Sequence, residues 1–370
     1  MIMDTFEELA AKKLSEMQRS QVRLPFSQSG FSLRSLESVS PCAYLGAAAA
    51  ITPLWKPVLK DSWQERYPVY ARTVASTVEQ VRGMVCRWEG HHLLPENPSD
   101  FWKFHTDGKG RYLDHVQRLL TMSSEDIKVR RFKDSLSPGD RARVLSASQK
   151  FASNWLQSSA SDTRIENNLF VKAVQLRLGN PGESDSDPAE ALSNKRTAPK
   201  IKDLRHKFLA QNIAKWAERA GAERAETEPK DLWTHDHLRP DVDLILGDKR
   251  FLVDVAVIHP TCPSHIVEAR NALGGAAEMV HVKEEKYAQM AASIKATVLP
   301  AVMETFGAIS EPLLELFKDI ANYSSMNPYG LWSRHEIYTG LLLDNSMILQ
   351  KWNARVLLHS QNVHQAAAAN

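Results

Sequence analysis

The stretch RPDVDLILGDKRFLVDVAVIHP, residues 239–260, decides the fold, because in it two strand-like runs flank a Gly-Asp pair. Taking Gly247-Asp248 as a two-residue turn, in which glycine is favoured at the first central position, makes the two runs a β-hairpin. Counting outward from this turn places Asp241 opposite Asp254, near the outer ends of the runs. The sequence therefore predicts a core hairpin that brings two acids face to face.

Alternation along the two runs assigns their side chains to two faces of the hairpin. One face is hydrophobic and consists of Val242, Leu244, Leu246, Phe251, Val253, Val255 and Val257. The other face carries acids and consists of Asp241, Asp243, Asp254 and Ala256, with Ile245 and Leu252 between them. We expect the first face to lie against the core.

Two carboxylates in opposed positions have Cβ atoms about 4.5–5.5 Å apart and repel each other. Raising the pKa of one acid or binding a cation relieves this repulsion. Two carboxylates suit Mg²⁺, which keeps several waters and meets phosphate oxygens, and such an ion assists phosphodiester cleavage. The alternative is an acidic strand end at the surface, since a register shift of one residue would separate Asp241 and Asp254 onto opposite faces.

The composition is that of an ordinary globular protein, with 370 residues that are 43% hydrophobic and 24% charged. No apolar run approaches the roughly 18 residues that span a bilayer, so we expect no membrane partner. The N-terminal stretch has early acids and no apolar signal core, which predicts that the chain is not secreted. Cys42, Cys86 and Cys262 form no CxxC pair, which favours a nuclear or cytoplasmic location and argues against a cysteine-based zinc site.

The pattern of elements predicts an α+β protein. Residues 1–60 and 61–178 form a largely helical region, and 179–200 is rich in Pro, Gly, Ser and charge, which is typical of a flexible linker. Residues 201–310 have the element order α-β-β-β-α-β, which predicts a small mixed α/β domain. Residues 311–370 are expected to form a helical tail.

The hairpin and the helix after it resemble a known nuclease family. RPD, followed after 12 residues by DVAV and then by KEEKY at 283–287, is similar to the restriction-like endonuclease domain of some non-LTR retrotransposon polyproteins, a member of the PD-(D/E)XK nuclease fold. RHKFLAQNIAKWAERAGAERAETEP, residues 205–229, resembles the helix and first strand that precede the catalytic hairpin. RLPFSQSGFSLRSLESVSPCAYLGA, residues 23–47, resembles the segment after the polymerase core, so that 1–60 is similar to a reverse-transcriptase tail.

The resemblance implies a metal site. In this fold two acids hold a divalent ion beside the scissile phosphate, which implies that Asp241, Asp254 and the carbonyl of Val255 bind Mg²⁺ or Mn²⁺. Glu228 is expected to complete the acidic cluster. His235 and His237 flank the hairpin and are the weaker candidates for metal contact, because an HxH pair in a loop is more often polar surface.

The resemblance also implies a catalytic lysine that positions or activates water. Its usual place, two residues after the second acid, is occupied here by Ala256. In the retrotransposon enzymes the lysine lies on the next helix, four residues before a tyrosine, which matches Lys283 and Tyr287, with Lys286 as a substitute. Tyr287 would support the lysine or contact a phosphate. Without the aspartates, KEEKY would read as a solvated helix face.

Two features of the family pattern are missing. The chain has no Tyr-x-Asp-Asp, so it has no reverse transcriptase active site, and residues 180–200 contain no Cys or His, so the zinc knuckle is absent. The chain is then a truncated, decayed or domesticated relative of such a polyprotein.

A basic segment, KRTAPKIKDLRHK, precedes the hairpin and has six Lys or Arg in thirteen residues. The formal charge of the chain is only +2, so DNA binding must come from local patches of this kind. The candidate phosphate contacts are Lys195, Arg196, Lys200, Lys202, Arg205, His206 and Lys207. The alternative is a linker whose charges are merely solvated.

The sequence thus predicts a metal-dependent DNA endonuclease, with element RNA or a polymerase as further candidate partners and the oligomeric state left open. Two alternatives remain. One is a DNA-binding remnant that has lost catalysis, and the other is a helical scaffold for protein interactions.

Overall fold

The computed structural model describes residues 2–9, 13–59, 63–85, 94–98, 115–156, 164–179, 188–194, 196–232, 238–326 and 331–368. The chain forms two compact units. The helical unit consists of residues 19–25 and 30–135, and the sheet-bearing unit consists of residues 1–18, 26–29 and 136–370. Helix α2 (Glu16–Arg23) contributes to both units.

Three helices pack together in the helical unit: α3 (Leu36–Leu59), α5 (Pro68–Met84) and α7 (Val116–Asp134), with the short α4 (Trp63–Arg66) next to α5. Helix α5 buries one stripe formed by Val74, Val78 and Val81. Helix α3 approaches α7 closely at Gly46, where a Cβ atom would lie 2.4 Å from Cβ of Gln117. The middle of the chain is therefore helical, as predicted.

The sheet-bearing unit contains one four-stranded sheet in the order β1-β2-β3-β4. Its strands are β1 (Arg224–Thr227), β2 (Val242–Leu246), β3 (Lys249–Ile258) and β4 (Thr297–Glu304). The β1–β2 and β2–β3 pairs are antiparallel, and β4 pairs parallel to β3 after the crossover helix α12 (Gly274–Ser293). Together with α11 (Pro199–Arg219), which precedes β1, this is the predicted α-β-β-β-α-β order.

The hairpin has the predicted register. Leu246 pairs with Lys249 across the turn, and Gly247 has a φ of 62°, which places glycine at the turn position that needs a positive φ. Asp241 lies one residue before β2 and its backbone N–H donates to the Val253 carbonyl at 2.9 Å. The strand pairing ends at Val242 with Val253, and Asp241 bonds to Val253 as well, so it lies at a bend just beyond the ladder, near Asp254 rather than in a paired position opposite it.

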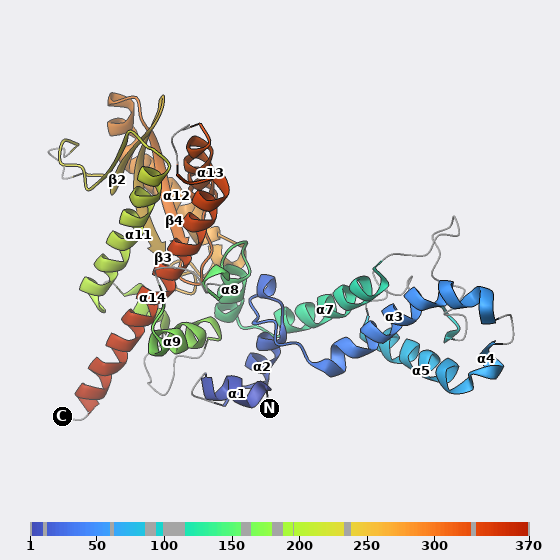
Figure 1. The fold of residues 1–370 in the computed structure, drawn as a ribbon. Helices are drawn as coiled ribbons and strands as arrows, with labels where there is room; N and C mark the ends of the chain where they lie inside the picture. Colours follow the sequence, from blue (N-terminus) through green and yellow to red (C-terminus); the bar gives the residue numbers. More distant parts are fainter. Residues whose placement is uncertain are drawn as a thin grey trace. The chain divides into compact units, whose positions relative to one another are not determined.

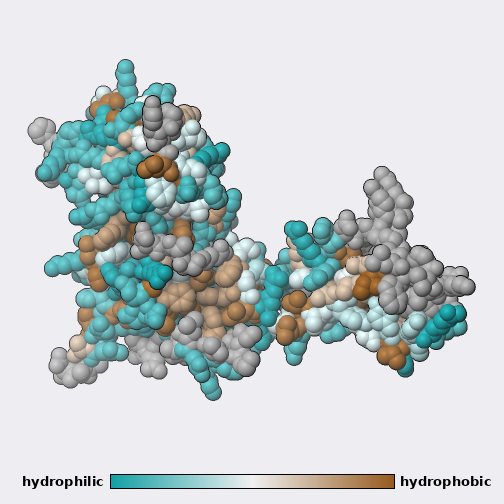
Figure 2. Space-filling view, viewed as in Figure 1, coloured by the Kyte–Doolittle hydropathy of each residue, from teal (hydrophilic) through white to brown (hydrophobic). Residues whose placement is uncertain are grey.

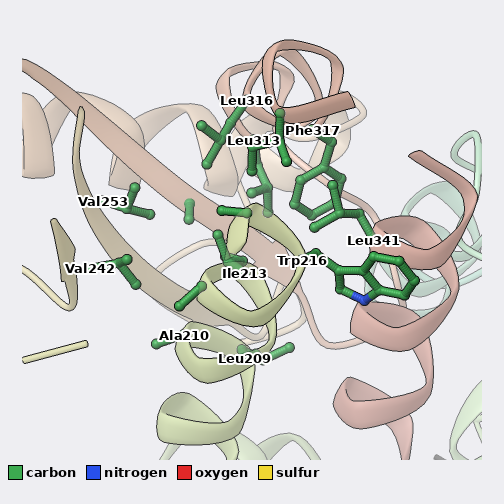
Figure 3. Close-up of a cluster of buried hydrophobic side chains, with 14 of the residues drawn as sticks. Leu209, Ala210, Ile213, Trp216, Val242, Val253, Leu313, Leu316, Phe317 and Leu341 are labelled. Atoms are coloured by element: carbon green, nitrogen blue, oxygen red, sulfur yellow. The ribbon is translucent and has the colours of Figure 1, made fainter. Parts of the chain in front are cut away.

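Helices α11, α13 (Glu311–Ser324) and α14 (Arg334–Ala368) cover one face of the sheet. Figure 3 shows the core between them, with α11 and α13 packed over Val242 and Val253 and Trp216 next to Leu341. Helix α12 covers the opposite face, where Ile258, Ala276 and Val302 are buried together. Helices α13 and α14 are thus part of the α/β core rather than a tail, and α11 and α14 lie side by side (Figure 1).

The remaining helices of this unit are short: α1 (Ile2–Leu9), α8 (Pro138–Ala147), α9 (Asn167–Arg177) and α10 (Pro188–Ser193), with 3₁₀ turns at Phe26–Gln28, Asn154–Leu156 and Glu268–Arg270. Helix α10 lies inside the segment 179–200 that was predicted to be a flexible linker. Its residues Ala191 and Leu192 are buried with Leu176 of α9 and Val356 of α14. The predicted boundary at 179–200 is therefore wrong, because α10 packs on distant helices within one compact unit.

None of the described helices is long and apolar enough to cross a bilayer. On the face drawn in Figure 2, hydrophilic residues cover much of the sheet-bearing unit and smaller hydrophobic areas lie among them.

Candidate active site

Asp241 and Asp254 lie near the point where β2 begins and β3 continues past it. Asp254 is 3% exposed in the middle of β3, whereas the side chain of Asp241 is half-buried. Oδ2 of Asp241 accepts a hydrogen bond from the backbone N–H of Val255 at 2.6 Å. Because the N–H and C=O of one strand residue point to the same side, the Val255 carbonyl points to this edge too. Two carboxylates and one carbonyl therefore come together here.

Helix α12 brings two lysines to Asp254. Nζ of Lys283 forms an ion pair with Oδ2 of Asp254, and Nζ of Lys286 lies 3.9 Å from Oδ1. The two lysines are three residues apart and so share one helix face. Their charges offset the repulsion between Asp254 and Asp241.

Tyr287 is 1% exposed on the same helix. Its hydroxyl donates to the Arg239 carbonyl at 3.0 Å and accepts from Nζ of Lys286 at 2.9 Å. Burial, and then the hydrogen bond and charge of Asp254, raise the pKa of Tyr287, so the phenol stays neutral. The tyrosine thus contacts Lys286 rather than Lys283, and its two predicted roles, supporting the catalytic lysine or contacting a phosphate, stay predictions.

Asp241 has its own hydrogen-bond partner on α11. Nε2 of His206 lies 2.9 Å from Oδ1 of Asp241. Burial alone would lower the pKa of His206, but the hydrogen bond and charge of Asp241 outweigh it, and the pKa is raised. The sequence predicted His206 only as a phosphate contact, because its approach to Asp241 depends on how α11 packs on the sheet.

A pocket of about 120 Å³ opens beside Asp241, between α11 and the end of β1. It is lined by His206, Lys207, Ala210, Gln211, Thr227, Glu228 and Asp241. The backbone N–H of Glu228, which has a φ of 52°, donates to the Asp241 carbonyl at 2.9 Å. The Glu228 carboxylate instead points to Arg239, with Oε2 3.3 Å from Nη2.

Among the described residues, no three side chains of His, Cys, Asp or Glu are grouped so that they could hold a metal ion. The carboxylate of Glu228 pairs with Arg239, and Glu228 lines the same pocket as Asp241, so its place in an acidic cluster stays a prediction. The pair Asp241 and Asp254 with the Val255 carbonyl still fits Mg²⁺, which proteins commonly hold through one or two carboxylates together with substrate phosphate. His235 and His237 lie outside the described residues.

The third acid on this face, Asp243, pairs with two arginines. It is fully buried and pairs with Nε of Arg224 at 2.6 Å and with Nη2 of Arg250 at 2.7 Å. A buried carboxylate needs such partners, and two guanidinium groups satisfy it. Asp243 is therefore separate from the Asp241–Asp254 pair.

The predicted phosphate contacts separate into different environments. Arg205 is 5% exposed and its Nη1 donates to Oδ1 of Asn353 on α14 at 2.6 Å, so the prediction that it contacts DNA is wrong. Nζ of Lys202 donates to the Asn194 carbonyl at 2.6 Å, and burial together with the charge of Arg205 lowers its pKa to about 8. Arg196, Lys200 and Lys207 are exposed. Lys195 lies outside the described residues.

The exposed side of α11 contains two polar residues that the sequence analysis missed, Gln211 and Lys215. Lys200, Lys207 and Lys215 are spaced seven and eight residues apart and lie on the same helix face. This spacing is visible in the sequence, but only the burial of the other side of α11 shows that the lysines point outward.

No protein-family model matches the chain, and no curated protein matches its sequence.

Proposed function

We propose that this protein is a divalent-metal-dependent DNA endonuclease related to the restriction-like endonuclease domain of non-LTR retrotransposon polyproteins. The observation that carries the proposal is that the Asp241 carboxylate bonds to the Val255 N–H, next to Asp254, while Lys283 forms an ion pair with Asp254. Two acids on a hairpin and a lysine on the next helix match the pattern of the resembled nucleases, and a divalent ion held by such acids can assist phosphodiester hydrolysis. The three separated cysteines of the sequence, which form no CxxC pair, support a nuclear or cytoplasmic location as part of this proposal.

Each residue has a role in this proposal. Asp241, Asp254 and the Val255 carbonyl hold the ion, which when bound lowers the pKa of the attacking water and stabilises charge on the phosphate. Lys283, which forms an ion pair with Asp254, would orient water or stabilise the negative charge that develops on the phosphate. The Tyr287 hydroxyl hydrogen-bonds to Lys286 and to the Arg239 carbonyl, and so restrains the backbone two residues before Asp241.

The exposed face of α11 is the proposed DNA contact. Lys200, Lys207 and Lys215 follow one another at about 10.5 and 12 Å along the helix axis, given a rise of 1.5 Å per residue. Lys207 and Gln211 also line the pocket beside Asp241. A DNA backbone that follows this face is therefore led to the two acids, through contacts with phosphate that do not depend on base sequence.

The test is the nicking of supercoiled plasmid by the full chain in Mg²⁺ or Mn²⁺. Asp241→Asn and Asp254→Asn should each reduce nicking at least about 100-fold, since loss of a ligand should cost at least as much as loss of an outer-shell partner. Asp248→Asn is the matched control, because Asp248 is an exposed aspartate in the turn of the same hairpin. Nicking that persists in both site variants, or that needs no metal, would contradict the proposal.

A second candidate is a DNA-binding protein without cleavage activity. It is favoured by the ion pair between Lys283 and Asp254, which a bound cation would have to displace. It predicts salt-dependent DNA binding by the wild type, no nicking, and no thermal stabilisation by Mn²⁺. Absence of both DNA binding and nicking would instead favour a helical interaction scaffold.

A further inference from the structure

We infer that His206 is a positioning residue that fixes the carboxylate of Asp241 in the orientation that the proposed metal site needs. The inference rests on the proposed nuclease function and adds a residue and a role to it. It assigns His206 to the acid pair rather than to a phosphate of DNA.

The backbone of Asp241 is held on both sides although the residue lies outside β2. Its N–H donates to the Val253 carbonyl at 2.9 Å, and its carbonyl accepts from the Glu228 N–H at 2.9 Å. These two bonds attach Asp241 to β3 and to the end of β1. The side chain is then the only part of the residue that can still change orientation.

The carboxylate of Asp241 has a donor at each oxygen. Oδ2 receives the Val255 N–H at 2.6 Å, and Oδ1 lies 2.9 Å from Nε2 of His206. Because the two donors belong to β3 and to α11, they restrict rotation of the carboxylate from two directions. Removing the imidazole would leave Oδ1 facing the pocket and would free the carboxylate to turn away from Asp254.

The imidazole itself is held by a rigid helix. Its neighbour Arg205 is buried and bound to Asn353, and Leu209 and Ala210 are buried in the core one turn later. His206 has a side chain that is 41% exposed and forms part of the pocket wall. The ring therefore reaches Asp241 from an anchored backbone, as a positioning group should.

The two acids are paired with side chains from different helices. Asp254 has Lys283 and Lys286 of α12, whereas Asp241 has His206 of α11. Nε2 of His206 already lies at hydrogen-bond distance from a carboxylate, while the exposed Lys207 next to it can meet a phosphate. This division of contacts favours positioning over DNA contact as the role of His206.

The experiment compares His206→Ala and His206→Gln with the wild type in plasmid nicking over a range of Mn²⁺ concentrations at saturating DNA. His206→Ala should raise the Mn²⁺ concentration for half-maximal nicking, or lower kcat, by about 10- to 100-fold, with KM for DNA unchanged. His206→Gln keeps an N–H donor near the position of Nε2 and should recover most of the loss. Asp203→Ala, an exposed substitution on α11, is the control and should behave as the wild type.

Three results would overturn the inference. The first is that His206→Ala leaves the Mn²⁺ requirement and kcat unchanged. The second is that His206→Ala changes only KM for DNA, which would show a phosphate contact. The third is that the Gln and Ala variants lose the same amount of activity. Thermal unfolding of each variant separates these results from misfolding, and the Gln variant alone decides the question if the Ala variant does not fold. If the wild type does not nick DNA, the proposed nuclease function itself is contradicted. If the wild type nicks DNA and His206→Ala nicks it equally well, only the role of His206 is contradicted.

Discussion

At the residue scale, His259 shows how burial fixes a protonation state. It is 4% exposed after β3, with Nδ1 2.6 Å from the Thr305 hydroxyl and Nε2 2.7 Å from the Thr261 hydroxyl. Burial, and then the charges of Arg205 and Lys202, lower the pKa of His259 from 6.5 to about 3. The imidazole is therefore neutral in the folded protein, and two hydroxyl groups satisfy its ring nitrogens.

This shift predicts a loss of stability in acid. Between pH 6.5 and about 3 the unfolded chain binds a proton at His259 that the folded chain does not bind, so the free energy of unfolding decreases as the pH falls through this window. The contribution is about 2 kcal/mol between pH 6.5 and 5, at about 1.4 kcal/mol per pH unit. Urea unfolding at pH 7, 6 and 5 should show a smaller decrease in His259→Gln than in the wild type. Equal decreases in the two proteins would contradict the assignment.

At the element scale, the turn of the hairpin sets the register of β2 and β3. Gly247 has a φ of 62°, and a Cβ atom there would lie 3.5 Å from Cε2 of Tyr323, which is an ordinary contact. Gly247→Ala should therefore lower the free energy of unfolding by about 1 kcal/mol through the backbone alone. Nicking should be retained, because Leu246 and Lys249 still pair.

Gly139 provides the matched comparison, because a Cβ atom at this position of α8 meets nothing within 4 Å. Gly139→Ala should raise the free energy of unfolding by about 0.5 kcal/mol, since alanine reduces the freedom of the unfolded chain. Chemical denaturation of the two variants beside the wild type tests both signs. Stabilisation by Gly247→Ala would show that the turn does not need a left-handed residue.

At the scale of the whole molecule, the net charge of +2 makes DNA binding depend on where the charges lie. Alanine at Lys200, Lys207 or Lys215 should each reduce the slope of log Kd against log salt by about 1 and weaken binding equally for different sequences. Fluorescence anisotropy of a labelled duplex over a range of salt concentrations measures the slope. Lys13→Ala, an exposed substitution outside α11, should leave the slope unchanged. An unchanged slope in all three α11 variants would exclude this face as the DNA contact.

The sequence by itself determined the hairpin and its register. Alternation with a period of two and a two-residue Gly-Asp turn are local properties, so they predicted the pairing from Leu246 and Lys249 to Val242 and Val253. The bend at Asp241, which ends this pairing, was not visible in the alternation. The order α-β-β-β-α-β followed from the same kind of periodicity. Lys283 could be predicted as a candidate because it precedes Tyr287 by four residues, about one turn of the next helix.

Only the tertiary structure decided which helices pack against the sheet and which of their side chains contact the acids. Arg205 is buried because α14 brings Asn353, 148 residues later in the chain, to its guanidinium group. The predicted linker contains a packed helix because Ala191 and Leu192 find apolar partners on α14. His206 reaches Asp241, and Glu228 turns to Arg239, through the packing of α11 and the end of β1 around the hairpin. Spacing along the chain describes neighbours within one element, whereas these contacts join elements whose relative position depends on burying a shared core.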